Sequence, residues 1–341
     1  MIRVGLIGAG FIGRNHFNQY EKLTDRAKVV ALCDADADRR AGDWSKVGGN
    51  LADAQGTKRD LGNIKPYTDW RELVADPEVD MVDICVPTYL HREITVAALQ
   101  AGKHVLCEKP MALKVEDCNE MIAAAKGPAK FMVAQCIRFW PEYVWLKKVV
   151  DSGEYGPLRA LHLRRHSSLP TYALNNWISS PEKSGGAILD LHVHDVDYAL
   201  YLLGKPKSVF AAGYQRTGGG IDRVYASWQY PSNVVLQLEA FWDMPPGFPF
   251  NMGFTAAFEK ASVHWDCAQG VPLKVYVMGE EPKTPEMPAE DGYFGEICHF
   301  LDCIEKNVKP SITTPEESRD AVALALAEQK SVLTGKPVEI N

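Results

Sequence analysis

The chain has 341 residues, a length that predicts two domains or one large domain with an appendage. Hydrophobic residues make up 46% and charged residues 24%, a balance typical of a globular protein and unlike that of a disordered or fibrous chain. The formal net charge of −7 argues against nucleic acids and anionic membranes as partners, because both bind clusters of Lys and Arg.

The apolar runs and the cysteines indicate where the protein is found. No apolar run approaches the roughly 20 residues that a membrane span requires. The N-terminus does not have the layout of a signal peptide, since residues 1–7 lead directly into a glycine cluster. The eight cysteines are scattered without a CxxC pair, and several fall in strand-like runs where Cys acts as a small buried hydrophobe. We therefore expect a soluble, reduced, cytoplasmic protein.

The first 136 residues alternate short apolar runs with segments of helical spacing. Near-continuous apolar strands separated by helices are typical of a parallel sheet covered on both faces. The sequence therefore predicts a doubly wound α/β domain over residues 1–136. Its strands are expected at 4–7, 29–33, 81–86, 105–107 and 131–134, and its helices at 11–23, 71–74, 91–100 and 115–125. The polar, glycine-dotted segment 41–65 is expected to be an elongated connection with room for one helix.

Residues 137–341 have a different pattern, with many strands in succession and short turns between some of them. This pattern predicts an antiparallel or mixed sheet; with the family resemblance given below, the fold expected here is an α+β domain with a large, open, mainly antiparallel sheet. Strands are expected at 158–166, 208–214, 224–230, 234–242, 254–258, 261–265 and 273–277. Two flanking helices are expected at 186–203 and 292–305, and a last helix at 315–334. These helices are too few to cover both faces of a broad sheet, so we expect a homodimer or homotetramer that contacts through the sheet.

The first chemical signal is the turn after the first strand, which reads Gly8-Ala9-Gly10-Phe11-Ile12-Gly13. Glycines at these positions permit a tight turn, a close approach of the backbone to a pyrophosphate, and close packing of helix on strand. The following helix offers free N–H groups and its positive dipole end to that anion. A GxGxxG alone also occurs in ordinary glycine-rich turns, so its surroundings decide between the two interpretations.

An acid at the end of the second strand supports a dinucleotide site. Asp34 lies 21 residues beyond Gly13, close to the spacing of about 20 expected for a carboxylate that binds the adenine ribose. Such an acid accepts hydrogen bonds from both ribose hydroxyls and repels a 2′-phosphate. The sequence therefore predicts NAD as cofactor, with NADP the less favoured alternative that Arg39 and Arg40 keep open.

The second chemical signal is Glu108-Lys109-Pro110 at the end of a predicted strand. The carboxyl ends of parallel strands face the ligand crevice, so Glu108 and Lys109 are expected to point toward the nicotinamide. A Lys there can hydrogen-bond a substrate hydroxyl or transfer a proton, whereas an isolated tripeptide of this kind is more often a surface ion pair. Pro87 and Thr88, with His91 one turn later, occupy the equivalent position after the preceding strand and are expected to contact the cofactor.

The third signal is the segment 184–197, in which Asp190 and His194 stand four residues apart. On a helix this spacing puts them on one face, where the carboxylate can orient the imidazole as a general base. A metal site built with His192 or Asp195 is disfavoured, because His192 and His194 diverge in direction on a helix. The remaining alternative is structural, with buried His and Asp satisfying one another. No metal is expected.

Together the three signals resemble the oxidoreductase family named after glucose–fructose oxidoreductase and inositol 2-dehydrogenase (Gfo/Idh/MocA). The resemblance covers essentially the whole chain, and its pieces are individually common but specific in their ordered sum. Beyond the motifs above, it includes 67–70, 86–91, 101–110, Arg138-Phe139-Trp140-Pro141, 185–197 and 313–317. The connection at 41–65 is longer than is typical of the family.

The resemblance implies a Rossmann domain at 1–136 that binds NAD, and a domain at 137–341 for substrate binding and oligomerisation. It also implies that Lys109, Asp190 and His194 are the catalytic residues, and that these three line the substrate site together with Arg138. The loop 172–177, which contains Trp177, and the segment 242–250 are expected to border the substrate.

The function predicted is hydride transfer between NAD and a secondary alcohol carbon of a sugar, inositol or related polyol. His194 takes the hydroxyl proton, Asp190 holds its ring, and Lys109 hydrogen-bonds the reacting oxygen. Whether Lys109 or His194 is the immediate base stays open, because the two can titrate as a coupled set. Two alternatives are an enzyme that retains NAD while it cleaves a glycoside, and a non-catalytic regulator that senses a dinucleotide or a sugar.

Overall fold

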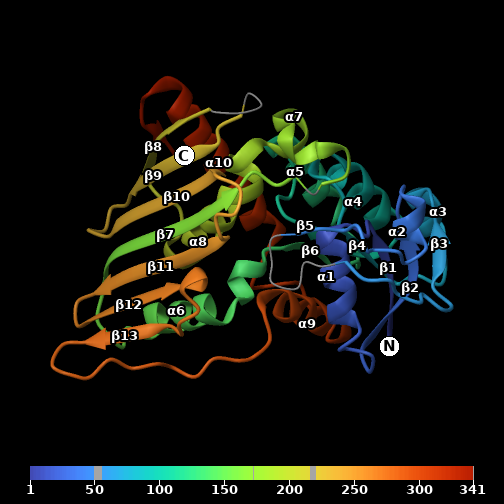
Figure 1. Cartoon of the computed structure of the whole chain (residues 1–341), viewed down its shortest axis with the longest axis horizontal. Coiled ribbons are helices and arrows are strands. Elements are labelled where there is room, and N and C mark those ends of the chain that lie inside the picture. The colour runs from blue at the N-terminus through green and yellow to red at the C-terminus, as the bar shows by residue number, and fades with distance from the viewer. Residues whose placement is uncertain (50–55, 172, 216–219, 341) are drawn as a thin grey trace. The chain divides into compact units, whose positions relative to one another are not determined.

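The computed structural model describes residues 1–49, 56–171, 173–215 and 220–340. The chain folds into two compact units (Figure 1). The first unit comprises Met1–Cys136, Thr171–Ile178 and Gly292–Arg319, and the second comprises Ile137–Pro170, Ser179–Asp291 and Asp320–Asn341. Within the described ranges, no helix has both the length and the apolar character needed to cross a membrane. The functions assigned above to residues 1–136 and 137–341 stay predictions.

A six-stranded parallel sheet forms the centre of the first unit, in the order β3-β2-β1-β4-β5-β6. Its strands are β1 (Ile2–Ile7), β2 (Ala27–Cys33), β3 (Lys65–Tyr67), β4 (Met81–Ile84), β5 (His104–Glu108) and β6 (Phe131–Ala134). The order of strands reverses between β1 and β4, and ligands of such sheets bind outside the carboxyl ends of the strands at this point. The doubly wound fold predicted from the sequence is confirmed, with β3 as an additional edge strand.

Helices pack on both faces of this sheet, and one of them comes from the far end of the chain. The helices are α1 (Phe11–Tyr20), α2 (Ala37–Arg40), α3 (Trp70–Ala75), α4 (His91–Gln100), α5 (Val115–Ala124) and α9 (Gly292–Glu305). The sequence predicts α9 at the same residues but as a flank of the C-terminal sheet. It instead packs against α1, where Ile297, Phe300 and Leu301 join the core formed by Leu6 and Phe17.

The second unit contains an eight-stranded sheet in the order β13-β12-β11-β7-β10-β9-β8-β14. Its strands are β7 (Leu158–Ser168), β8 (Ser208–Tyr214), β9 (Arg223–Gln229), β10 (Val235–Met244), β11 (Asn251–Phe258), β12 (Ala261–Asp266), β13 (Lys274–Val277) and β14 (Val338–Glu339). Neighbouring strands are antiparallel except for β7 and β10, which run parallel. The predicted large, mainly antiparallel sheet is therefore confirmed.

Helices cover one face of this sheet. The other face carries exposed large side chains, because burial alternates along strands such as β8 and β9. Tyr143 on one helix packs against the rings of Phe254 and Trp265, and Glu328 on another accepts a hydrogen bond from Trp228. The helices of the second unit are α6 (Pro141–Ser152), α7 (Pro181–Ser184), a π-helical turn (Ile188–His192), α8 (Val193–Leu203) and the part of α10 (Pro315–Thr334) from Asp320 onward. Short 3₁₀ turns lie at Thr88–Leu90, Cys136–Phe139, Leu174–Ser179 and Cys267–Gln269. The exposed large apolar side chains of the sheet are Phe210, Tyr214, Tyr225, Val235 and Tyr276.

The close contact between Gly13 and the turn before it yields a stability prediction. A Cβ on Gly13 would lie 1.8 Å from the carbonyl oxygen of Gly8, whereas a Cβ on Gly10 would meet nothing nearer than Arg39 Nη1 at 3.7 Å. We expect Gly13→Ala to lower the free energy of unfolding by about 3 kcal/mol. The control Gly10→Ala should cost about 1 kcal/mol or less, because it meets no backbone. Urea unfolding of both variants measures this, and equal losses would contradict the packing argument.

Candidate active site

The turn after β1 has the geometry of a phosphate-binding turn. Gly8 has φ of +95° and its missing Cβ would lie 2.4 Å from the carbonyl oxygen of Cys85, so only glycine fits there. Gly10 is the N-cap of α1, and no side chain caps that helix end. The first N–H groups of α1 therefore point into a turn without side chains, where a pyrophosphate can accept them.

Asp34 follows β2 and is fixed beside this turn. Its Oδ2 accepts the N–H of Ala9 at 2.7 Å, and its Oδ1 accepts the N–H of Asp36 at 2.8 Å. Each carboxylate oxygen has a further lone pair, so the group can still accept hydrogen bonds from ribose hydroxyls. Arg40 donates to the main-chain oxygen of Asp34 at 2.6 Å. The turn and this acid together fit the pyrophosphate and adenine ribose of NAD.

The residues after β4 are held by His91. Its two ring nitrogens each lie 2.9 Å from a carbonyl oxygen, Nε2 from that of Val86 and Nδ1 from that of Pro110. Burial lowers the pKa of His91, although the two carbonyl oxygens favour its charged form. His91 thus ties the loop after β4 to the loop after β5. Thr88 is buried at the start of the intervening 3₁₀ turn, next to Pro87 at its N-cap.

Glu108 and Lys109 at the end of β5 have different surroundings. The Glu108 side chain is buried, its Oε2 accepts the Lys109 N–H at 3.0 Å, and its Oε1 lies 3.2 Å from Nε2 of His16. The Glu108 side chain therefore points into the unit, whereas the sequence predicts that it points toward the nicotinamide. Lys109 is half-buried and accessible at the carboxyl end of the strand. His16 belongs to this arrangement and was not selected from the sequence.

Asp190 and His194 lie on a helical segment of the second unit that is otherwise buried. Between residues 186 and 200 these two side chains alone are partly exposed. A π-helical turn at Ile188–His192 precedes α8, where the sequence predicts a regular helix. A π turn inside a helix often marks a functional site. Both side chains are therefore accessible to a ligand, and their catalytic role stays a prediction.

The neighbours of this pair are held by buried partners. Arg165 donates to both carboxylate oxygens of Asp195, at 2.9 and 3.1 Å, and Nε2 of His192 contacts the carboxylate of Glu328. These contacts give His192 and Asp195 partners other than a shared metal ion. They also anchor the helix next to the partly exposed pair.

Two residues predicted to bind substrate have other surroundings. The Arg138 side chain is fully buried, and it donates to both oxygens of Asp197 at 2.8 Å, so its part in substrate binding stays a prediction. Trp177 is half-buried in the 3₁₀ turn Leu174–Ser179. Tyr172, which begins the loop expected to border the substrate, and residues 50–55 of the long connection lie outside the described residues.

The predicted catalytic residues belong to different units. Lys109 is part of the first unit, and Asp190 and His194 are part of the second. Within the first unit, the structure brings together the glycine turn, Asp34 and the residues after β4. Their arrangement at the reversal point of a parallel sheet defines a dinucleotide-binding protein.

Comparison with known proteins identifies the family. Residues 2–135 match the oxidoreductase family with an NAD-binding Rossmann fold, and residues 143–264 match the GFO/IDH/MocA C-terminal domain. Inositol 2-dehydrogenase of Salmonella typhimurium is 31% identical over 98% of this chain and 95% of its own length. The chain therefore belongs to the GFO/IDH/MocA family of NAD-dependent oxidoreductases.

Further similar proteins agree with this assignment. The 1,5-anhydro-D-fructose reductase of Ensifer adhaerens is 29% identical over 100% of this chain and 99% of its own length. Among solved structures, a levoglucosan dehydrogenase in complex with NADH and levoglucosan superposes with a TM-score of 0.85 and 21% identity. It covers 99% of both chains. At this identity the superposition establishes the fold.

The position of Asp34 yields a prediction about cofactor preference. A carboxylate at the ribose repels a 2′-phosphate, so NADH should bind at least about tenfold more tightly than NADPH, equivalent to about 1.4 kcal/mol. Asp34→Asn keeps the size of the side chain and one acceptor oxygen but removes the charge, and should erase most of this preference. Fluorescence titration with both nucleotides measures it. The matched control is Asp38→Asn on α2, which should keep the preference; equal affinities in the wild type would refute the role of Asp34.

Proposed function

We propose that this protein oxidises a secondary alcohol of a sugar, inositol or related cyclic polyol, with NAD as hydride acceptor. The observation that carries the proposal is the partial exposure of Asp190 and His194 on an otherwise buried segment of an NAD-dependent oxidoreductase. The relatives support the substrate class, since their names specify inositol, anhydrofructose and levoglucosan, all polyhydroxylated compounds.

In this proposal each residue has one task. NAD, when bound, supplies the acceptor for the hydride. His194 accepts the proton of the substrate hydroxyl, and Asp190 orients the imidazole and stabilises its charged form. Lys109 hydrogen-bonds the same oxygen, where negative charge develops as the hydride leaves. Because Lys109 and His194 both act on this proton, the base is assigned to the pair.

A substrate panel tests the proposal directly. Inositols, hexoses, pentoses and glycosides are incubated with NAD, and NADH formation is followed by absorbance. Steady NADH formation with a cyclic polyol is the expected result. Release of aglycone from a glycoside without net NADH would indicate the NAD-retaining glycoside-cleaving enzyme instead. Nucleotide binding without any turnover would indicate a regulator.

The catalytic and structural roles of His194 make opposite predictions. If His194 is the base, His194→Ala should lower kcat by about a hundredfold or more and leave thermal unfolding and NADH binding close to wild type. Lys109→Ala should behave likewise, and the double variant should lose less than the product of both losses.

The matched control is His192→Ala, two residues away. It removes the buried partner of Glu328 and should destabilise the fold by about 3 kcal/mol. Near-wild-type turnover in His194→Ala would refute its catalytic role. A collapse of His194→Ala like that of the control would assign the residue to the fold.

We further propose that the exposed face of the eight-stranded sheet is the contact of a homodimer or homotetramer. The aromatic side chains of Phe210, Tyr214 and Tyr225 are exposed on neighbouring strands β8 and β9, and apolar patches of this kind mark protein interfaces. Light scattering should give a multiple of 37.8 kDa. Tyr225→Lys should shift the protein toward the monomer, whereas the control Leu333→Lys, at an exposed position of α10, should not. A monomer at all concentrations would overturn this assignment.

The absence of disulfides among the described residues supports a cytoplasmic location. None of the eight cysteines is in a disulfide, and burial raises the pKa of Cys118 to about 12, so its thiol stays protonated and unreactive at neutral pH. Thiol titration of the freshly isolated, denatured protein should return eight free groups. A lower number would point to an oxidising compartment.

A further inference from the structure

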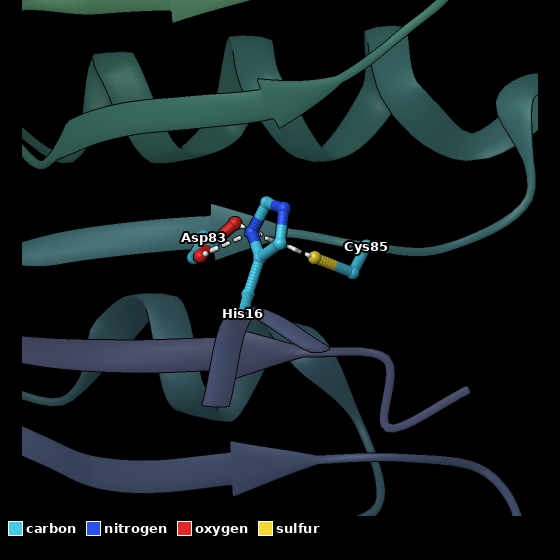
Figure 2. Close-up of side chains that lie close together, drawn as sticks. All are labelled: His16, Asp83 and Cys85. Atoms are coloured by element: carbon cyan, nitrogen blue, oxygen red, sulfur yellow. Dashed lines mark hydrogen bonds and ion pairs between the residues drawn. The ribbon is translucent and has the colours of Figure 1, made fainter. Parts of the chain in front are cut away.

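A buried histidine connects the phosphate-binding helix to the ends of two strands. His16 lies in the second turn of α1, three residues after Gly13, and its side chain is fully buried. Figure 2 shows its ring between Asp83, on β4, and Cys85, just beyond it. Nδ1 of His16 lies 2.9 Å from Oδ2 of Asp83 and 3.6 Å from Sγ of Cys85. Tyr20, one turn further along α1, donates to the same oxygen of Asp83 at 2.8 Å.

The other ring nitrogen of His16 also lies near carboxylates. Nε2 is 3.2 Å from Oε1 of Glu108, at the end of β5, and 3.6 Å from Oε1 of Glu296, on α9. Burial opposes the charged ring, but the neighbouring Cys85 and Asp83 outweigh it and raise the pKa of His16 well above its usual value. A carboxylate thus lies on each side of the ring, Asp83 at Nδ1 and Glu108 at Nε2, and both favour its charged form.

Glu108 connects His16 to Lys109, the predicted catalytic lysine. One of its oxygens faces His16, and the other accepts the main-chain N–H of Lys109 at 3.0 Å. Because the Glu108 side chain is buried, water screens its charge poorly. The structure therefore links the buried carboxylate of Glu108 to Lys109 through the main chain of Lys109.

We propose that His16 and Glu108 are positioning residues, a buried ion pair that fixes Lys109 at the end of β5 and sets the pH range in which Lys109 exchanges a proton. This inference rests on the role proposed above for Lys109. His16 and Glu108 touch neither substrate nor cofactor in it; they act through Lys109.

Electrostatics predicts opposite shifts for the two partners. Loss of the His16 charge leaves the Glu108 carboxylate without this neighbour, which favours the charged form of Lys109, so Lys109 is expected to keep its proton to higher pH. Loss of the Glu108 charge removes the carboxylate next to Lys109 while the His16 ring keeps Asp83 as its partner, so Lys109 is expected to lose its proton at lower pH. The other groups around the pair, Asp83, Cys85, Tyr20, Glu296 and the ring of Tyr293, are the same in both variants.

The experiment measures the titration of Lys109 itself. Full-length wild type, His16→Gln and Glu108→Gln are labelled with acetic anhydride between pH 6 and 11, and the modification of Lys109 is read by mass spectrometry. We expect the midpoint to rise by about half a unit or more in His16→Gln and to fall by a similar amount in Glu108→Gln. The acidic limb of kcat/KM, measured with a substrate from the panel, should move in the same two directions.

The control is Tyr20→Phe, which removes a hydrogen bond from the same cluster without changing its charge. Its thermal midpoint should fall by a few degrees, and the Lys109 midpoint should stay at the wild-type value. A purely structural cluster would lower the thermal midpoint in all three variants and shift the Lys109 midpoint in none, which would overturn the proposal. If His16→Gln does not fold, the direction of the shift in Glu108→Gln decides alone.

Two further results separate this inference from the proposed function. Unshifted labelling midpoints combined with a Lys109→Ala variant that has lost turnover would overturn the ion pair and leave the function standing. Turnover of Lys109→Ala at the wild-type rate would overturn both.

A metal analysis tests the ion pair in another way. One divalent cation per chain, found by elemental analysis and lost in His16→Gln, would show that His16 and Glu108 ligate a metal and would overturn the ion pair.

Discussion

The first unit depends on one steric constraint, the contact between Gly13 and the carbonyl oxygen of Gly8. At that separation no side chain can intervene, so α1 lies directly on the turn that precedes it. The position of α1 then determines three further features. It directs uncapped N–H groups into the turn, buries Phe17 against the sheet, and brings His16 to the ends of β4 and β5. A single methyl group at Gly13 would disturb all three at once.

Much of this framework follows from local sequence. Apolar runs locate the strands because a parallel sheet is buried on both faces, and a glycine motif followed by an acid at the end of β2 identifies the dinucleotide turn. Local sequence does not show which distant element a helix packs against. The apolar stripe of α9 marks a helix but does not say which sheet it covers, and the structure puts it on α1. Glu296 consequently joins His16, a proximity of residues 280 positions apart that no spacing rule contains.

Other elements were not predicted from the sequence for local reasons. The helix α6 was not predicted, although Pro141 at its first position and Gly153 in a left-handed conformation at its end are recognisable signals. Strand β3 is three residues long and carries Pro66, which is typical of an edge strand and weak as a signal. The π turn before α8 has no sequence signature of its own. The exposure of Asp190 and His194 nevertheless agrees with their spacing, because the two stay on one side of the segment while ion pairs of their neighbours hold the rest inside.

The late position of α9 has a consequence for how the protein is made. The core around Phe17 is complete only when residues of α9 reach it, and these follow the whole stretch 137–291 in the chain. On a ribosome that adds about 5–20 residues per second, the first unit waits many seconds with an apolar face of α1 uncovered. Its nascent form therefore exposes apolar surface until α9 is made, and a gene fragment that ends at residue 136 encodes a unit with an open core. Domain exchange between relatives has to transfer the α9 segment together with the first 136 residues.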